Sequence, residues 1–144
     1  MTIGRIIEGR DPATIITCEG SARLSDAVTC LAEQRIGALP VLDSSGGVAG
    51  ILSERDVVYR LRDEGGSCLD RRVADVMTAP AITVERSTRI DEALELMTRR
   101  RIRHLPVVEG GRMVGFVSIG DLVKAKIDDA LREAEQMRQY IRTA

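Results

Sequence analysis

Two short segments of the sequence carry a serine followed three residues later by an aspartate: Ser53 with Asp56, and Ser118 with Asp121. If each segment lies where a strand leads into a helix, a hydroxyl and a carboxylate meet beside backbone N–H groups that attract phosphate. A carboxylate can also accept hydrogen bonds from both hydroxyls of a ribose. Because hydrogen bonds to charged groups contribute about 1.5–3 kcal/mol each, Asp56 and Asp121 could determine whether a nucleoside is held. The alternative is that both acids only stabilise their helix dipoles.

Other kinds of chemistry have few residues to support them. The chain contains a single histidine, His104, and no GxSxG, HExxH or Walker sequence. Cys18, Cys30 and Cys68 are far apart and lack CxxC spacing, so neither a disulfide framework nor a zinc site is indicated. We therefore expect a protein that is not an enzyme and that requires no metal.

Composition narrows the possible partners. The 144 residues include 21 Lys and Arg against 22 Asp and Glu, and only two Tyr, one Phe and no Trp. A nucleic-acid binder usually shows a basic excess, and single-strand binders often stack bases on aromatic rings, so we do not expect nucleic acid as a partner. No apolar run approaches the roughly 20 residues that span a bilayer, and charge interrupts the N-terminus early. We expect no membrane partner and a cytoplasmic location, which suits free thiols.

The elements that must position the two Ser-x-x-Asp segments are repeated. Residues 21–28 resemble residues 87–94, and Leu39-Pro40-Val41 recurs as Leu105-Pro106-Val107, both at a separation of 66 residues. After the Gly-rich turns the separation becomes 65, which aligns residues 50–56 with residues 115–121. The chain is therefore two copies of one unit.

Within each copy the same periodicities follow in the same order. β-Branched runs at residues 14–17 and 81–84 predict strands. Apolar residues at helical spacing follow, from Leu24 to Leu31 and from Ile90 to Met97. Two short apolar runs around a Gly-rich turn then predict a hairpin, at 39–52 and at 105–117. A second helix follows, with Ser53 or Ser118 as its N-cap.

These elements predict an α+β fold made of two β-α-β-β-α repeats, with residues 1–72 holding the first and residues 73–144 the second. The polar, Gly-containing residues 63–72 suit a connector, and residues 73–77 predict a short helical turn before Pro80. One unit of about 50–60 residues could scarcely bury its own apolar sheet face, so we expect the two copies to cover each other.

The end of the chain departs from the repeat. Ile127, Ala130, Ala134, Met137 and Ile141 recur at 3-4-3-4 spacing, which predicts an extended C-terminal helix with a narrow apolar seam. The seam either belongs to the internal core or contacts a second subunit, and its position past the repeat favours the subunit contact. A two-fold homodimer is the expected arrangement.

Residues of roughly 10–127 resemble the tandem cystathionine-β-synthase (CBS) domain pair, or Bateman module, of the stand-alone bacterial type. The resemblance rests on residues 36–41 and 50–56 in the first copy, and on residues 103–107 and 115–121 in the second. It implies two repeats related by a pseudo-two-fold axis, adenine-nucleotide binding in the cleft between them, regulation in place of catalysis, and a flat dimer.

The resemblance also assigns candidate ligand-binding residues to two sites. One combines Ser118, Ile119 and Asp121 with Thr17, Ala22, Ile36, Gly37 and Ala38. The other combines Ser53, Glu54 and Asp56 with Thr83, Thr88, Ile102, Arg103 and His104. The sites differ, because Gly37 and Ala38 suit packing against a base whereas Arg103 and His104 suit phosphate.

Plainer interpretations stand beside several of these assignments. Thr17 and Thr83 fit a strand without any ligand. His104 could be a half-buried residue with a backbone partner. The basic run Arg99-Arg100-Arg101 could interact only with the helix dipole and water, or it could form a funnel for polyphosphate.

The leading hypothesis is a sensor that binds AMP, ADP, ATP or NADH as a regulatory ligand and signals energy or redox state to an unknown effector protein. The alternative is a structural dimerisation module, or a binder of another adenosyl ligand such as S-adenosylmethionine. Nucleic-acid binding through the basic run is a weaker third hypothesis, because the overall charge is balanced.

Overall fold

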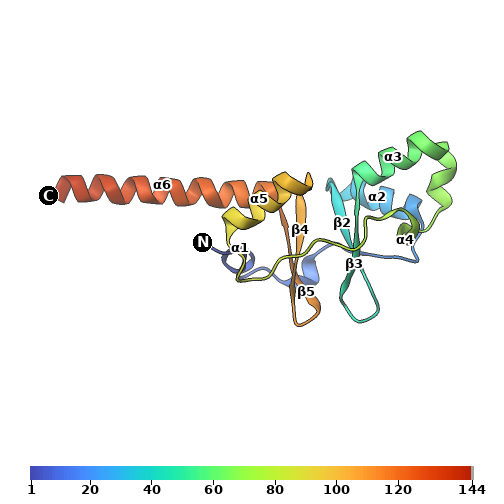
Figure 1. Cartoon of the computed structure of the whole chain (residues 1–144), viewed down its shortest axis with the longest axis horizontal. Helices are drawn as coiled ribbons and strands as arrows, with labels where there is room; N and C mark the ends of the chain where they lie inside the picture. The colour runs from blue at the N-terminus through green and yellow to red at the C-terminus, as the bar shows by residue number, and fades with distance from the viewer. Residues whose placement is uncertain (144) are drawn as a thin grey trace.

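The computed structural model describes residues 1–143 and confirms the α+β fold (Figure 1). The first part of the chain forms α1 (Ile3–Ile7), η1 (Pro12–Thr14), β1 (Cys18–Glu19), α2 (Leu24–Gln34), β2 (Ala38–Leu42), β3 (Val48–Ser53) and α3 (Glu54–Glu64). The second part forms η2 (Gly65–Asp70), α4 (Val73–Val76), α5 (Ile90–Arg100), β4 (His104–Glu109), β5 (Arg112–Ser118) and α6 (Ile119–Thr143).

Both predicted hairpins are confirmed. β2 pairs antiparallel with β3, with Pro40 opposite Ile51, and β4 pairs antiparallel with β5, with Pro106 opposite Phe116. The register shifts at the same place in each hairpin, after Val41 and after Val107. The two hairpins therefore deliver Ser53 and Ser118 to equivalent positions at the start of α3 and α6.

The prediction for the first strand is wrong in position in the first copy and too long in the second. Residues 12–14 form the 3-10 helix η1, because Pro12 fixes its φ and the Asp11 side chain accepts the N–H of Ala13. Pairing begins only at β1, parallel to β2. In the second copy it shrinks to one bridge, between Val84 and Val107.

The helix predictions hold. α2 and α5 each bury the predicted stripe, with Leu24, Ala27 and Leu31 buried in the first copy. Both helices end on an arginine in the left-handed conformation, Arg35 with φ 53° and Arg101 with φ 54°. The backbone N–H of each cap bonds back into the last turn, which closes the helix just before the strand that follows.

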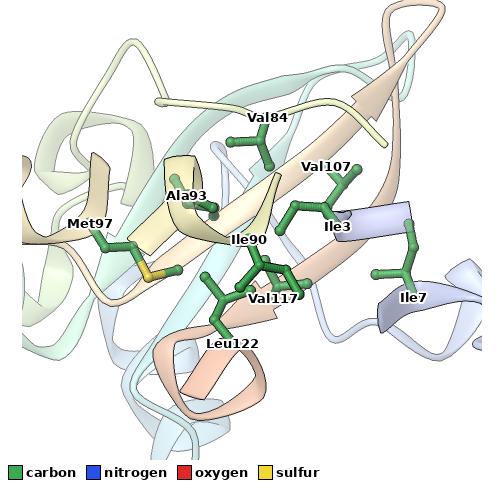
Figure 2. Packing of buried hydrophobic residues seen from close by; sticks show 10 residues of the cluster. Ile3, Ile7, Val84, Ile90, Ala93, Met97, Val107, Val117 and Leu122 are labelled. Carbon is green, nitrogen blue, oxygen red and sulfur yellow. The ribbon is translucent and has the colours of Figure 1, made fainter. Parts of the chain in front are cut away.

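The interior consists of two separate apolar clusters, and not of one core shared by two sheets. Figure 2 shows the second cluster, in which Ile90, Ala93 and Met97 of α5 pack against Val107, Val117 and Leu122. The first cluster holds Leu24, Leu31, Leu39, Val41 and Leu52 with their neighbours. Each cluster covers one face of its own sheet. On the other face Ala38, Pro40 and Pro106 are buried outside both clusters, so the expectation that the two copies cover each other there stays a prediction.

Two short helices, α1 and α4, each complete the cluster of the opposite copy, and we call them the crossing helices. Each crossing helix together with the residues that follow it, up to Pro12 or Pro80, forms a crossing segment. Ile3 and Ile7 of α1 lie in the second cluster, and Val73 and Val76 of α4 lie in the first. The contacts are matched: Ile3 N–H donates to the Thr88 carbonyl at 2.8 Å, and Val73 N–H donates to the Ala22 carbonyl at 2.8 Å. This reciprocal crossing has the pattern of a pseudo-two-fold axis. It also places the N-terminal helix with the second cluster, whereas the division at residue 72 groups it with the first repeat.

Two equivalent glycines make room for the crossing segments. A Cβ on Gly50 would lie 2.7 Å from Met77 Sδ and 2.8 Å from the Thr78 carbonyl oxygen. A Cβ on Gly115 would lie 2.9 Å from both Cδ1 and Cγ2 of Ile7. The absent side chains therefore allow each crossing segment to lie directly against β3 or β5.

The 25-residue helix α6 confirms the predicted C-terminal extension. Leu122 near its start is fully buried, but the helix then leaves the second cluster and projects away from the rest of the molecule (Figure 1). The seam residues Ile127, Met137 and Ile141 are 54%, 61% and 69% exposed, so the interpretation as internal core is wrong. Within residues 1–143, no helix is both long and apolar enough to cross a membrane.

Candidate functional site

Two cavities lie where the copies meet. Cleft 1 has a volume of about 380 Å³ and combines the start of α6 with β5, the segment after α1 and the edge of β2. Its lining residues are Ile7, Arg10, Asp11, Pro12, Thr14, Ile15, Ile16, Ile36, Ala38, His104, Val114, Gly115, Phe116, Ser118 and Asp121.

Cleft 2 is the related cavity at the start of α3, with a volume of about 300 Å³. It is lined by Gly37, Ala38, Ile51, Ser53, Glu54, Arg55, Asp56, Tyr59, Thr78, Pro80, Ala81, Ile82, Arg100, Arg101, Ile102, Arg103 and His104. Both clefts therefore draw on both copies, and each contains one Ser-x-x-Asp segment.

In each segment the serine and the aspartate cap the helix reciprocally. The Asp56 amide donates to Ser53 Oγ at 3.2 Å while the Ser53 amide donates to Asp56 Oδ2 at 2.9 Å. The second copy repeats this pair, at 3.1 Å for Asp121 N–H to Ser118 Oγ and 2.9 Å for Ser118 N–H to Asp121 Oδ2. These capping boxes hold each carboxylate at the mouth of its cleft.

The other oxygen of each carboxylate takes a partner from the crossing segment of the opposite copy. Thr78 Oγ1 donates to Asp56 Oδ1 at 2.9 Å in cleft 2. In cleft 1, Arg10 Nη2 lies 3.3 Å from Asp121 Oδ1. Burial raises the pKa of Asp121, but hydrogen bonds from Ser118 and Arg10 outweigh burial and hold the pKa below its ordinary value. Asp121 is therefore ionised at neutral pH.

His104, at the start of β4, lines both clefts, whereas the sequence assigned it to one. Its ring stacks on that of Phe116, with the centroids 5.4 Å apart and the planes at 13°. Burial, followed by the charge of Arg103, lowers the pKa of His104, and Asp121 and Glu54 oppose this only in part. The imidazole is therefore neutral at pH 7 and forms part of the wall between the clefts.

Cations distinguish cleft 2 from cleft 1. Arg55, Arg100, Arg101 and Arg103 all line cleft 2. Arg103 lies 3.9 Å from Glu54, and Arg55 donates to the Arg101 carbonyl at 3.0 Å. Arg100 and Arg101 of the predicted basic run thus face cleft 2, while Arg99 is absent from the lining of both clefts.

The structure brings ten of the sixteen predicted site residues to the cleft to which they were assigned. Cleft 1 contains Ile36, Ala38, Ser118 and Asp121, and cleft 2 contains Ser53, Glu54, Asp56, Ile102, Arg103 and His104. Gly37 lines cleft 2 in place of cleft 1, and Ala38 lines both. Whether these residues contact a ligand stays a prediction.

The other five predicted residues lie outside both linings. Ala22 and Thr88 hold the crossing helices through their carbonyl groups. Thr17 and Thr83 do not line the clefts, but their sequence neighbours Ile16 and Ile82 do. Ile119 packs against the second cluster and faces a shallower groove of about 470 Å³.

Sequence reasoning missed the contribution of the crossing segments. Arg10 and Thr78, which contact the two carboxylates, belong to neither repeat alignment. The sequence did mark the ends of these segments, because Pro12 and Pro80 each precede the first paired residue of a copy by a few positions.

The described residues contain no group of three or more His, Cys, Asp or Glu placed to hold a metal ion.

The sequence is similar to CBS domains and to known proteins that contain them. The CBS domain family matches residues 12–63 and 73–128. The CBS domain-containing protein CBSX3, mitochondrial, of Arabidopsis thaliana is 36% identical over 128 residues, which cover 86% of this chain and 62% of the relative. An inosine-5′-monophosphate dehydrogenase of Mycobacterium leprae is 37% identical over 113 residues, 77% of this chain but only 20% of that enzyme. The chain thus spans less than two thirds of these curated relatives.

Solved structures agree with the fold. A putative signal-transduction protein with CBS domains from Burkholderia ambifaria is 40% identical, with a TM-score of 0.81 over 90% of this chain and 96% of that one. CBSX2 in complex with AMP is 26% identical, with a TM-score of 0.76 over 90% and 98%. The CBS domain pair of a protein solved with 5′-methylthioadenosine and S-adenosyl-L-methionine is 22% identical, with a TM-score of 0.76 over 90% and 98%, and shows the fold alone. The duplicated unit, its reciprocal crossing and both family matches lead to one conclusion: the chain belongs to the CBS domain family, with two CBS domains in tandem.

Proposed function

We propose that the protein is a regulatory sensor that binds an adenine nucleotide, AMP, ADP, ATP or NADH, in clefts 1 and 2. The observation that carries this proposal is the matched pair of capped carboxylates, Asp56 and Asp121, each at a helix start that opens into a cavity built from both copies. In this proposal each carboxylate accepts the hydroxyls of a ribose.

The walls of the clefts support the same ligand class. Volumes of about 380 and 300 Å³ fall at the lower end of the roughly 300–1,000 Å³ typical of small-molecule sites. Apolar side chains such as Ile36, Val114 and Phe116 provide surfaces on which a base can pack. The arginines of cleft 2 suit phosphate groups, and a relative of similar fold was solved with AMP.

The proposal assigns regulation and not catalysis to the chain, in line with its matches to CBS domains. The signal would pass to an effector protein, and the expected cytoplasmic location remains part of the proposal.

We also propose a two-fold homodimer. Apolar residues exposed on α3 and on the first half of α6, among them Val58, Leu61 and Val123, give such a dimer a surface to bury.

A structural dimerisation module is the second candidate, favoured by this same exposed apolar surface. A third arrangement keeps the clefts but fills them with another adenosyl ligand, as in the distant relative solved with S-adenosyl-L-methionine. Ligand binding separates these candidates, because a purely structural module would bind none of the nucleotides.

The test is calorimetric titration of AMP, ATP and NADH into the wild-type chain and into Asp121→Asn and Asp56→Asn. Asparagine can still accept the serine amide, so each capping box survives while the charge is lost. We expect each variant to weaken binding at its own cleft by about tenfold or more, the effect of losing charged hydrogen bonds.

The control is Asp26→Asn, which removes a first-turn acid from α2, away from both clefts. Affinities in this control should match those of the wild type. Equal affinities in all four proteins would show that Asp56 and Asp121 only cap their helices. The absence of any binding heat with the wild type would overturn nucleotide binding.

A further inference from the structure

Arg10 forms a contact that the repeat does not explain. It lies between α1 and η1, and its guanidinium reaches Asp121 with both terminal nitrogens, Nη2 to Oδ1 at 3.3 Å and Nη1 to Oδ2 at 3.5 Å. The two side chains are 47% and 30% exposed, so the pair is open to solvent on one side. A partly exposed pair at these distances is weak enough to be exchanged for another partner.

The equivalent place in cleft 2 carries no charge. There the hydroxyl of Thr78 donates to Asp56 at 2.9 Å, and a hydroxyl can turn away or accept at little cost. The crossing segments therefore set the two carboxylates in different electrostatic environments, with a cation on Asp121 and a neutral group on Asp56.

The rest of the cleft 1 lining offers little to an anion. It is mostly aliphatic and aromatic, and its other ionisable groups are Asp11, Asp121 itself and His104. His104 is neutral at pH 7, because burial lowers its pKa. Among the described residues that line cleft 1, Arg10 is the one permanent cation.

Arg10 and the hydroxyls of a bound ribose would compete for the carboxylate of Asp121. While Arg10 holds Asp121, neither carboxylate oxygen is free to accept ribose hydroxyls without loss. An uncharged nucleoside would displace the guanidinium and leave it unpaired, whereas a nucleoside 5′-phosphate would offer it a new anionic partner. We propose that Arg10 selects the ligand of cleft 1 by exchanging Asp121 for phosphate, so that this cleft takes adenosine 5′-phosphates in preference to uncharged adenosine or 5′-methylthioadenosine.

This inference rests on the proposed function and deepens it at one cleft. The experiment is titration of adenosine and of AMP into two proteins that share Asp56→Asn, one with Arg10 and one with Arg10→Gln. The shared substitution weakens cleft 2, so the ratio of the two affinities reports on cleft 1. If that variant folds poorly, the change in the ratio caused by Arg10→Gln in the otherwise wild-type chain gives the same test, because Arg10 lines cleft 1 and not cleft 2.

With Arg10 present we expect AMP to bind about tenfold or more tightly than adenosine, the effect of a charge-assisted contact. Arg10→Gln should tighten adenosine, weaken AMP and bring the ratio close to one. Arg5→Gln is the control, because it removes the same charge from an exposed position on α1 that lines neither cleft, and it should leave the ratio unchanged.

The outcomes separate this inference from the proposed function. A ratio that is unchanged by Arg10→Gln, with both ligands still bound, would overturn the role of Arg10 and leave nucleotide binding intact. Binding of AMP by the wild type but by neither Asp56→Asn protein would show that cleft 1 is not a nucleotide site. Failure of the wild type to bind either ligand would overturn the proposed function as well.

Discussion

Asp56 and Asp121 each have a structural task in helix capping and a second contact at the cleft. One carboxylate oxygen closes a capping box, and the other meets a group from the opposite copy. Loss of a cap costs about 0.5–2 kcal/mol, so a substitution that removes the side chain also lowers the free energy of unfolding. Asparagine variants therefore separate the two tasks better than alanine variants do.

His104 predicts a simple dependence of stability on pH. Burial lowers the pKa of His104 in the folded state, with Arg103 acting in the same direction and Asp121 and Glu54 against it. Between the folded pKa and the unfolded value near 6.5, the unfolded chain binds more protons, so stability falls as the pH drops through this window. His104→Gln should lose less stability than the wild type between pH 7.5 and pH 5.

Urea unfolding at both pH values measures this difference. The assignment is clean because the chain contains a single histidine. If the wild type and His104→Gln lose stability equally steeply, the pH dependence comes from protonation of carboxylates and not of His104.

At this scale the sequence predicted the serines and aspartates, because the repeat displays them twice. It could not predict Arg10, whose partner Asp121 is 111 residues away and whose segment has no aligned copy. Nor could it place His104 between the clefts, since spacing along a strand does not specify which neighbours meet across it.

Among the elements, the crossing helices connect the two copies most closely. Hairpins and amphipathic helices were predictable, because their periodicities are local. The first strand was misplaced in the first copy and predicted too long in the second, because pairing depends on what lies beside the backbone and not on β-branched residues alone. The exchange of α1 and α4 between clusters was not predictable from pattern, since a short apolar segment fits either one.

Gly50 and Gly115 allow a test of the crossing. Gly50→Ala should destabilise the fold by about 1–3 kcal/mol, the usual cost of overpacking, because the added Cβ meets the Thr78 backbone carbonyl at 2.8 Å. Gly115→Ala should cost less, because its Cβ meets only the Ile7 side chain. Denaturant unfolding of both variants measures the difference, and a larger loss for Gly115→Ala would mean that the α1 contact is the tighter one.

For the whole molecule, the seam of α6 predicts how assembly responds to truncation. Removal of the residues after Lys126 should weaken self-association, because Ile127, Met137 and Ile141 have no partner within the described chain. Nucleotide binding should survive, since every lining residue of clefts 1 and 2 precedes that point. The seam contains two alanines that bury little area, so dimerisation should weaken without being abolished.

Light scattering over a dilution series, with calorimetry on the same samples, checks both parts of this prediction. A full-length chain that is monomeric at micromolar concentration, with or without nucleotide, would remove the subunit role of the seam. The sequence predicted this seam from its spacing alone, and only the structure shows that it lies outside both clusters.

The continuity of α6 has a mechanical consequence. The helix starts at the wall of cleft 1, where Asp121 meets Arg10, and runs without interruption to Thr143. At about 1.5 Å per residue its 25 residues span roughly 37 Å. A tilt of about 5° at the first turn would therefore move the far end by about 3 Å. If the proposed exchange of Arg10 between Asp121 and phosphate tilts the first turn, the length of α6 would convert that small change in the cleft into a larger displacement at Thr143.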